Sequence, residues 1–246
     1  MDLDSLMEPK RLPEKPWRVD AFLLLGAGIV LCLFGGMVAA TMVHDLSNKN
    51  DSWNSTINMV IGILSFQGMA LLLVHFFLRE HHTGWVDGFG FNIETRRAIV
   101  VGALGGLCAL PVTWGLEIFS SILLRLLAFN PKEQEAVQIL RSTEGWQNRL
   151  VLGVATIIIA PVAEEILFRG ILYPFIKRIG YPKLAWWVTA LLFAAVHLNV
   201  ATFIPLAFLA VVLIWLYEHT GNLLTCIVTH SLFNAANFIA LYFIGN

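Results

Sequence analysis

The sequence predicts an all-α membrane protein, a polytopic bundle of about seven or eight spanning helices around a central intramembrane cavity. Composition is the first observation behind this prediction, because 57% of the 246 residues are hydrophobic and only 13% are charged. Soluble domains carry about twice that charged fraction. The second observation is a mean hydropathy of +0.72, and the third is that the apolar residues form runs as long as a bilayer requires. The composition therefore excludes a disordered chain and argues against a soluble enzyme.

Seven apolar runs approach the length of about 20 residues that a spanning helix needs. They are residues 21–43, 57–78, 98–128, 150–172, 184–198, 201–217 and 223–244. The fifth and sixth runs are short and almost continuous, whereas the third is long enough for a tilted span with an interfacial extension. The first run is longer than the apolar core of a typical signal peptide, so we interpret it as a retained span.

We divide the chain into a tail (residues 1–20), a helical region (residues 21–149) and a core that carries the chemistry (residues 150–246). The polar segment 130–149 has acidic residues early and apolar residues at helical spacing. This pattern suits a short amphipathic helix at the membrane interface, and it equally suits a plain connecting loop.

Basic residues gather on one side of the predicted membrane. Ten Lys and Arg residues fall in the tail and in the loops after the second and fourth spans, against four in the opposite loops. This asymmetry predicts a cytoplasmic N-terminus and, with seven spans, a C-terminus on the other side. The net charge of -1 gives no basic surplus for a nucleic-acid partner. The short loops are typical of a multi-pass protein of the bacterial cell membrane.

Two adjacent carboxylates, Glu164 and Glu165, lie inside the fourth apolar run and are followed by Arg169. Ionisable groups at membrane depth are costly and usually face a bundle interior or a wet cavity. Arg169 is four residues after Glu165, so the two share a helix face and can pair. Glu164 points about 100° away and lacks that partner. We therefore interpret Glu165 as structural and Glu164 as a candidate general base.

Further polar groups lie in the fifth and last runs. His197 follows Phe193 by four residues, and His230 and Asn234 project from one face of the last helix. Imidazole exchanges protons near neutral pH, and both His and Asn can donate to a developing oxyanion. The helical rise places Glu164 and His230 at similar depths, about 12 Å from the cytoplasmic ends of their spans, and His197 higher, at about 20 Å.

The sequence lacks the residues that other classes of intramembrane hydrolase need. All six Asp residues lie outside the apolar runs, which excludes an aspartyl pair, and His-Glu-x-x-His and Gly-x-Ser-x-Gly motifs are absent. The three cysteines are far apart in apolar runs and predict neither disulfides nor a thiolate metal site. We interpret His75 as a core group, Glu117 and Arg125 as packing or interfacial residues, and Gly102 with Gly106 as a close helix contact.

The ordered motifs resemble the signature of the CPBP family of intramembrane endopeptidases, which includes the type II CaaX prenyl protease and Abi-type proteins. The matching motifs are Glu164-Glu165-x-x-x-Arg169, Phe193-x-x-x-His197 and His230-x-x-x-Asn234. The resemblance covers roughly residues 150–246. It implies peptide-bond hydrolysis inside a membrane cavity, with Glu165, Arg169 and Phe193 in supporting roles that fix the helix and the shape of the cavity.

The same resemblance implies catalytic roles for four residues. Glu164 and His197 would activate a water, and His230 and Asn234 would hold the tetrahedral oxyanion. Many relatives carry a second His four residues after the first, where this chain has Ala201. The Glu and His residues could in principle bind Zn²⁺, but the missing His favours a metal-free glutamic mechanism without a cofactor.

Two hypotheses for function follow. The first is an endopeptidase whose partners are membrane lipid and a membrane-associated or lipidated protein or peptide substrate. The alternative is a non-catalytic immunity factor or scaffold of the Abi type, which would use the same cavity to bind a partner. The intact residue set favours the enzyme.

Overall fold

The computed structural model describes residues 12, 14–46, 60–130 and 134–244, so residues 1–11 of the predicted tail lie outside it. Every regular element in this part of the chain is a helix, which confirms the all-α class. The α-helices are α2 (Val19–Leu46), α4 (Met69–Glu80), α5 (Trp85–Phe89), α6 (Thr95–Leu126), α7 (Glu135–Ser142), α8 (Trp146–Val154), α9 (Ala160–Glu165), α10 (Tyr173–Arg178), α11 (Pro182–Ala195), α12 (Val200–Thr220) and α13 (Leu224–Ile244). Three wider π-helical segments are η1 (Leu64–Gly68), η2 (Ala155–Ile159) and η3 (Ile166–Leu172).

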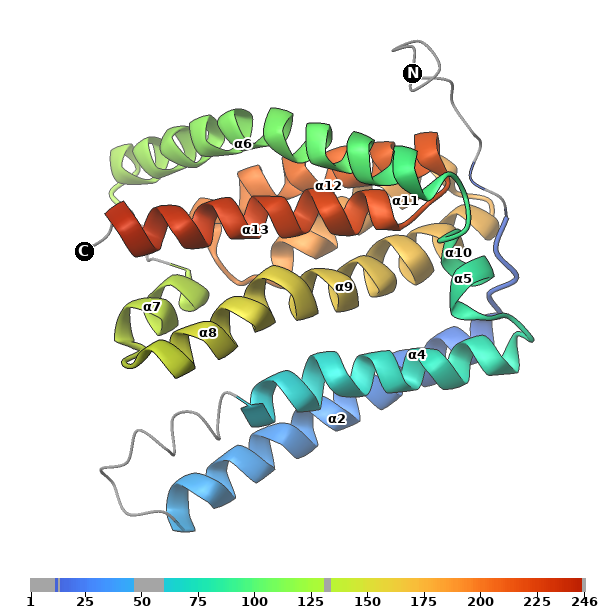
Figure 1. Cartoon of the computed structure of the whole chain (residues 1–246), viewed down its shortest axis with the longest axis horizontal. Coiled ribbons are helices and arrows are strands. Elements are labelled where there is room, and N and C mark those ends of the chain that lie inside the picture. The colour runs from blue at the N-terminus through green and yellow to red at the C-terminus, as the bar shows by residue number, and fades with distance from the viewer. Residues whose placement is uncertain (1–11, 13, 47–59, 131–133, 245–246) are drawn as a thin grey trace.

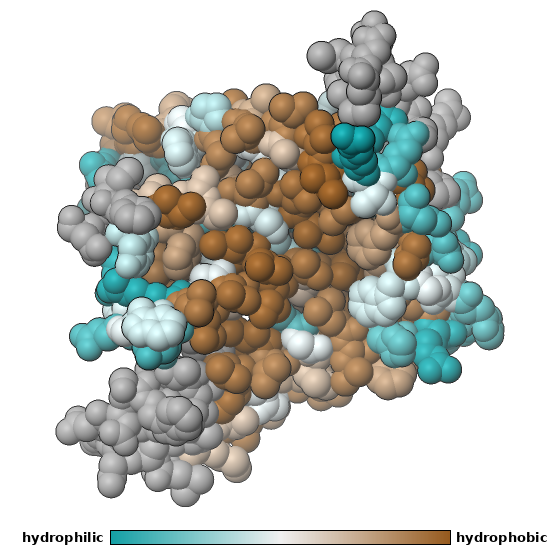
Figure 2. Space-filling view, viewed as in Figure 1, coloured by the Kyte–Doolittle hydropathy of each residue, from teal (hydrophilic) through white to brown (hydrophobic). Residues whose placement is uncertain are grey.

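Six helices in the described residues are long and apolar enough to cross a membrane. They are Val19–Met42, Val60–Glu80, Thr95–Leu126, Trp146–Arg178, Val200–Thr220 and Leu224–Tyr242. The expected fifth span is instead α11, whose 14 residues fall short of the roughly 20 that a span needs. An apolar belt across the molecule separates two polar ends (Figure 2), as a multi-pass membrane protein requires.

The segment between the third and fourth spans is helical. α7 occupies part of the segment for which sequence left a helix and a loop equally open, so the structure favours the short amphipathic helix there. After a brief turn, a single long helix begins at Trp146 and continues to Arg178 through α8, η2, α9, η3 and α10. The fourth span is therefore longer at both ends than the predicted 150–172, and Glu164 lies near its middle.

The helices form a core and a separate hairpin. α6, α12 and α13 pack closely on one another, α11 packs on α12, and the long helix from α8 to α10 runs beside them (Figure 1). The hairpin of α2 and α4 lies along the other side of that long helix. α2 begins and α13 ends at opposite ends of the bundle (Figure 1). The basic loops after α4 and α10 lie at the end where α2 begins, as the charge pattern predicts.

Small residues bring α6 and α13 into close contact and so fix the helix that carries His230. A Cβ atom at Gly102 would lie 2.6 Å from the Thr225 carbonyl oxygen, and one at Gly106 would lie 3.2 Å from the Thr229 carbonyl oxygen. The Thr229 hydroxyl also donates to the Gly102 carbonyl at 2.8 Å. The predicted close contact of Gly102 and Gly106 is confirmed. Thr229, which takes part in this contact, is the residue before His230, so the contact also fixes the position of His230.

The π segments of the long helix end just before prolines. η2 precedes Pro161 and η3 precedes Pro174. Proline has no N–H, and its ring crowds the carbonyl four residues earlier, so the helix widens ahead of it. The carbonyls of Thr156 and Gly170 lie five and four residues before these two prolines, and each accepts a side-chain hydrogen bond instead. Asn234 Nδ2 donates to Thr156 at 2.8 Å, and Trp17 Nε1 donates to Gly170 at 3.0 Å.

Trp17 attaches the start of the hairpin to the core. Its side chain is buried, and its ring packs against Phe77 with 5.1 Å between ring centroids. Arg178, at the end of α10, donates to the Trp17 carbonyl oxygen. Phe22 stacks on Phe175 at 4.0 Å. These contacts tie the N-terminal segment to the helix that carries the two carboxylates.

Candidate active site

Glu165, Arg169 and His230 form a buried ionic network between the long helix and α13. Arg169 Nη1 donates to Glu165 Oε1 at 3.0 Å, which confirms the predicted pairing. His230 Nδ1 lies 2.7 Å from the same oxygen. The side chains of Glu165 and Arg169 are fully buried and that of His230 is 3% exposed. Because the carboxylate accepts, Nδ1 of His230 carries the proton. Glu165 therefore fixes both the arginine and the ring orientation of the histidine.

Phe193 joins the three motifs. Its fully buried ring carries the Arg169 guanidinium on its face, with 4.2 Å between the guanidinium carbon and the ring centroid. The rings of His230 and His197 contact it at centroid distances of 5.6 and 5.0 Å. A cation over an aromatic face is stabilised by the ring quadrupole, and more so when desolvated. The supporting residue predicted at this position thus lies between groups from all three motifs.

Glu164 approaches His230 from the side opposite Glu165. Its Oε2 lies 3.9 Å from Nε2 of His230, and its side chain is 19% exposed. That oxygen is buried, and no donor in the described part of the chain reaches it within hydrogen-bonding distance. The two neighbouring carboxylates therefore flank one imidazole, as the matching depths of Glu164 and His230 suggest. Glu165 accepts two hydrogen bonds, both at Oε1, and its buried Oε2 has no donor among the described residues, whereas Glu164 comes no closer to a partner than the 3.9 Å to His230.

His197 lies in the turn between α11 and α12 and is half-buried. Its Nδ1 is 2.7 Å from the Phe193 carbonyl oxygen. A carbonyl can only accept, so Nδ1 carries the proton and Nε2 of the neutral ring keeps a lone pair. Among the described residues, no hydrogen bond or ion pair links His197 to Glu164. The next residue, Leu198, has a left-handed backbone with φ of 51° and is 93% exposed, a rare conformation for a bulky side chain.

Asn234 has a structural partner that the sequence did not reveal. Its side-chain nitrogen donates one hydrogen to the Thr156 carbonyl in η2. An amide nitrogen has two hydrogens, so one N–H remains for another acceptor. The residue thus links α13 to the long helix on the other side of the acidic pair from Arg169.

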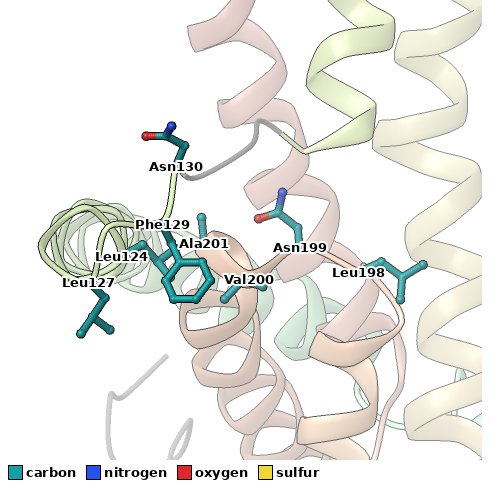
Figure 3. Close-up of a pocket in the computed structure, with 8 residues that line it drawn as sticks. All are labelled: Leu124, Leu127, Phe129, Asn130, Leu198, Asn199, Val200 and Ala201. Carbon is teal, nitrogen blue, oxygen red and sulfur yellow. The ribbon is translucent and has the colours of Figure 1, made fainter.

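A surface hollow of about 470 Å³ begins next to the turn of His197. Side chains from the end of α6 and from the turn before α12 line it (Figure 3): Leu124, Leu127, Phe129, Asn130, Leu198, Asn199, Val200 and Ala201. A second hollow on α6 includes Glu117 and Arg125. Neither contains Glu164 or His230, so the central cavity stays a prediction.

No group of three His, Cys, Asp or Glu side chains in the described residues is arranged to hold a metal ion. The site thus combines two carboxylates, two imidazoles and an amide, of which Glu165 and Asn234 already have protein partners.

Comparison with known proteins identifies a family for the C-terminal part of the chain. Residues 146–236 match the family model described as type II CAAX prenyl endopeptidase Rce1-like. The matched segment is less than half of the chain, and it contains every residue of the three motifs. No curated protein and no solved structure matches the chain significantly. The match confirms the family resemblance and includes the whole acidic and histidine cluster.

Proposed function

We propose that this chain, a member of the Rce1-like family over residues 146–236, is an intramembrane endopeptidase that uses Glu164 as its general base. One observation carries the proposal. Two carboxylates flank His230, but only Glu165 accepts hydrogen bonds from described side chains, from Arg169 and from the imidazole, both at Oε1. Glu164 keeps a buried oxygen without a donor. An acceptor held next to a histidine inside a membrane helix is suited to take a proton from water.

The proposed reaction begins with a water hydrogen-bonded to Glu164. Glu164 takes one proton as the water oxygen bonds to the substrate carbonyl carbon, which becomes tetrahedral and carries an oxyanion. When the oxyanion collapses, the C–N bond breaks and the proton on Glu164 passes to the leaving nitrogen. The products are a carboxyl group and an amine, and Glu164 returns to its ionised form.

His197 acts with Glu164 in this proposal. The hydrogen bond from Nδ1 to the Phe193 carbonyl leaves Nε2 as the ring's acceptor. An imidazole held in this tautomer can accept a hydrogen bond from the Glu164 carboxyl group once that group has taken the proton of the attacking water. The rings of His197 and His230 both contact Phe193, so His197 is one side chain away from the imidazole that Glu164 approaches.

His230 and Asn234 are the proposed donors to the oxyanion. Nδ1 of His230 stays bonded to Glu165, and Nε2 can donate to the oxyanion when that nitrogen also carries a proton. Asn234 can donate the amide hydrogen that Thr156 does not use. Donors fixed before the reaction stabilise developing charge without reorganisation, and here the bonds to Glu165 and Thr156 provide that fixation.

The proposed substrate is a membrane-anchored peptide whose scissile bond reaches the level of Glu164. The family description names a CAAX prenyl endopeptidase, so a peptide with an isoprenyl-cysteine near its C-terminus is the first candidate. A non-prenylated membrane peptide is the second, in keeping with short loops that are typical of bacterial proteins.

The test is cleavage in liposomes by the purified protein. Each candidate peptide is presented in the same bilayer, and products are identified by mass spectrometry in water enriched in oxygen-18. We expect one heavy oxygen in the new carboxyl group, and loss of cleavage in Glu164→Ala. Equal turnover by Glu164→Ala would remove the proposed role of Glu164. No turnover of any peptide, with partner protection in cells that survives Glu164→Ala, would favour the non-catalytic scaffold.

A separate experiment tests the metal-free mechanism. We expect turnover to persist after treatment with a chelator and dialysis. If the chelator abolishes cleavage and added Zn²⁺ restores it, the glutamic mechanism is wrong and the metal-dependent alternative is right.

A further inference from the structure

Gln67 of the α2–α4 hairpin has a side-chain oxygen that solvent does not reach. We infer that Gln67, in η1, faces Glu164 and that the two side chains hold the attacking water together; this inference rests on the proposed function. η1 packs against α9, the short helix that carries Glu164. The hairpin lies wholly outside residues 146–236, so Gln67 belongs to none of the motifs that indicate the family.

The helical register places Gln67 on the face of the hairpin that meets the core. Ala70 and Val74, three and seven residues after Gln67, are buried. Residues at this spacing share one face of a helix. Ser65 faces another way, because a Cβ atom at Gly36 in α2 would lie 2.3 Å from the Ser65 side chain. One side of η1 therefore contacts α2, and the side with Gln67 contacts α9.

Both elements carry a buried acceptor without a donor. Gln67 Oε1 and Glu164 Oε2 are each inaccessible to solvent, and no protein donor in the described residues reaches either atom. A buried polar atom that lacks a partner costs roughly 1–3 kcal/mol, and such groups are usually satisfied by ordered water. A single water satisfies both acceptors, because it has two hydrogens to donate.

This arrangement suits the attacking water chemically. One hydrogen points to the Glu164 carboxylate, which takes it during attack, and the other points to the Gln67 carbonyl, which keeps it. Both lone pairs of the water oxygen are then free to face the substrate carbonyl. Nε2 of His230, at 3.9 Å from Glu164 Oε2, lies beside the same place. Gln67 would thus fix the direction of attack, while Glu164 alone changes its protonation.

The activity test compares three variants in liposomes. Gln67→Met keeps the length of the side chain but removes the amide, and we expect kcat to fall by about tenfold to a hundredfold with KM nearly unchanged. Gln67→Asn keeps a shorter amide and should recover part of that loss. Ser65→Ala, on the α2 side of the same segment, should keep the wild-type kcat. Wild-type kcat in Gln67→Met, or an equal fall in Ser65→Ala, would overturn the inference.

The placement of Gln67 is tested without any activity. In a background with Cys32, Cys108 and Cys226 changed to Ala, the pair Gln67→Cys and Glu164→Cys is treated with a short bis-maleimide, and crosslinked peptides are detected by mass spectrometry. We expect this pair to crosslink and the control pair, Ser65→Cys with Glu164→Cys, not to. If the wild-type protein cleaves peptide but the test pair does not crosslink, the inference about Gln67 is wrong and the proposed function stands. A linked pair in a chain whose wild type cleaves no peptide would overturn the attacking role of the water together with the proposed function.

Discussion

The two faces of the helix around α9 differ in the partners that their carboxylates have. On one face, Glu165 contacts both Arg169 and His230, and the arginine lies on Phe193. On the other face, the nearest partner that Glu164 has among the described residues is Nε2 of His230, at 3.9 Å from its buried Oε2. Two identical, adjacent side chains thus occupy opposite environments. The fold therefore uses Glu165 to hold three helices together and leaves Glu164 available for chemistry.

The face with Glu165 stabilises the fold, and the face with Glu164 serves catalysis. Substitutions on the Glu165 face should unfold or loosen the protein, because they leave buried charges or helix carbonyls without partners. Substitutions on the Glu164 face should reduce turnover in a protein that stays folded. Variants on the two faces can therefore be compared by their stability and by their turnover.

Replacement of Arg169 should have the largest effect. Arg169→Met leaves the carboxylate of Glu165 buried without its cation, and we expect a loss of about 3–5 kcal/mol in the free energy of unfolding. Denaturation in mixed micelles measures it. The double variant with Glu165→Gln should recover part of the loss, because the uncompensated charge is then gone. Unchanged stability in Arg169→Met would show that the Glu165 face is not structural.

Replacement of His197 should reduce turnover without loosening the fold. The ring is half-buried, and its hydrogen bond is to the Phe193 carbonyl of the preceding helix, α11. We expect His197→Gln to lower kcat by about a hundredfold or more, as removal of a proton-transfer group does. Its unfolding midpoint should match that of the wild type. A variant that keeps full turnover would place His197 outside the reaction.

Gly170 should tolerate no side chain. A Cβ atom there would lie 2.6 Å from the ring of Phe89, so Gly170→Ala should cost about 1–3 kcal/mol of stability. Gly115 is the matched control, since a Cβ atom at Gly115 meets nothing within 4 Å. Thermal unfolding should therefore separate the two Ala variants. Equal unfolding temperatures for Gly170→Ala and Gly115→Ala would mean that η3 can move away from Phe89 without loss of stability.

The bond from Trp17 to Gly170 should have the smallest effect of the four. Trp17→Phe keeps an aromatic ring but leaves the Gly170 carbonyl without a donor, at a cost of about 1 kcal/mol. Trp85→Phe is the control, because it removes an indole bond whose acceptor is Nδ1 of His75 in α4 rather than a carbonyl of η3. We expect kcat to fall only for Trp17→Phe. A fall in kcat for Trp85→Phe but not for Trp17→Phe would show that the bond from Trp17 does not affect the site.

Local spacing predicted much of the site. Four-residue separations indicated that Glu165 pairs with Arg169, and the pattern of Gly102 and Gly106 indicated the close contact that positions α13. These features depend on helical geometry alone, which sequence supplies. The prolines at 161 and 174 were local signals for the wider turns before them, although a proline does not show by itself which side chain will satisfy the freed carbonyl.

The remaining features depend on contacts between distant segments. The hydrogen bond from His230 to Glu165 joins positions 65 residues apart, and that from Trp17 to Gly170 joins positions 153 apart. The length of α11 also escaped prediction. Its apolar run continues to Leu198, but the helix ends at Ala195 and the left-handed backbone of Leu198 follows. Packing against the other helices decides these features, and no single stretch of sequence contains that information.

The most direct test of the division between the two carboxylates is the single-turnover rate of Glu164→Gln in a bilayer, measured beside its unfolding midpoint. The substitution keeps the shape of the side chain and removes its ability to take a proton. We expect the rate to fall by about a thousandfold while the midpoint stays at the wild-type value. A rate close to that of the wild type, or a midpoint that falls as far as that of Arg169→Met, would contradict the assignment of Glu164 as the free base.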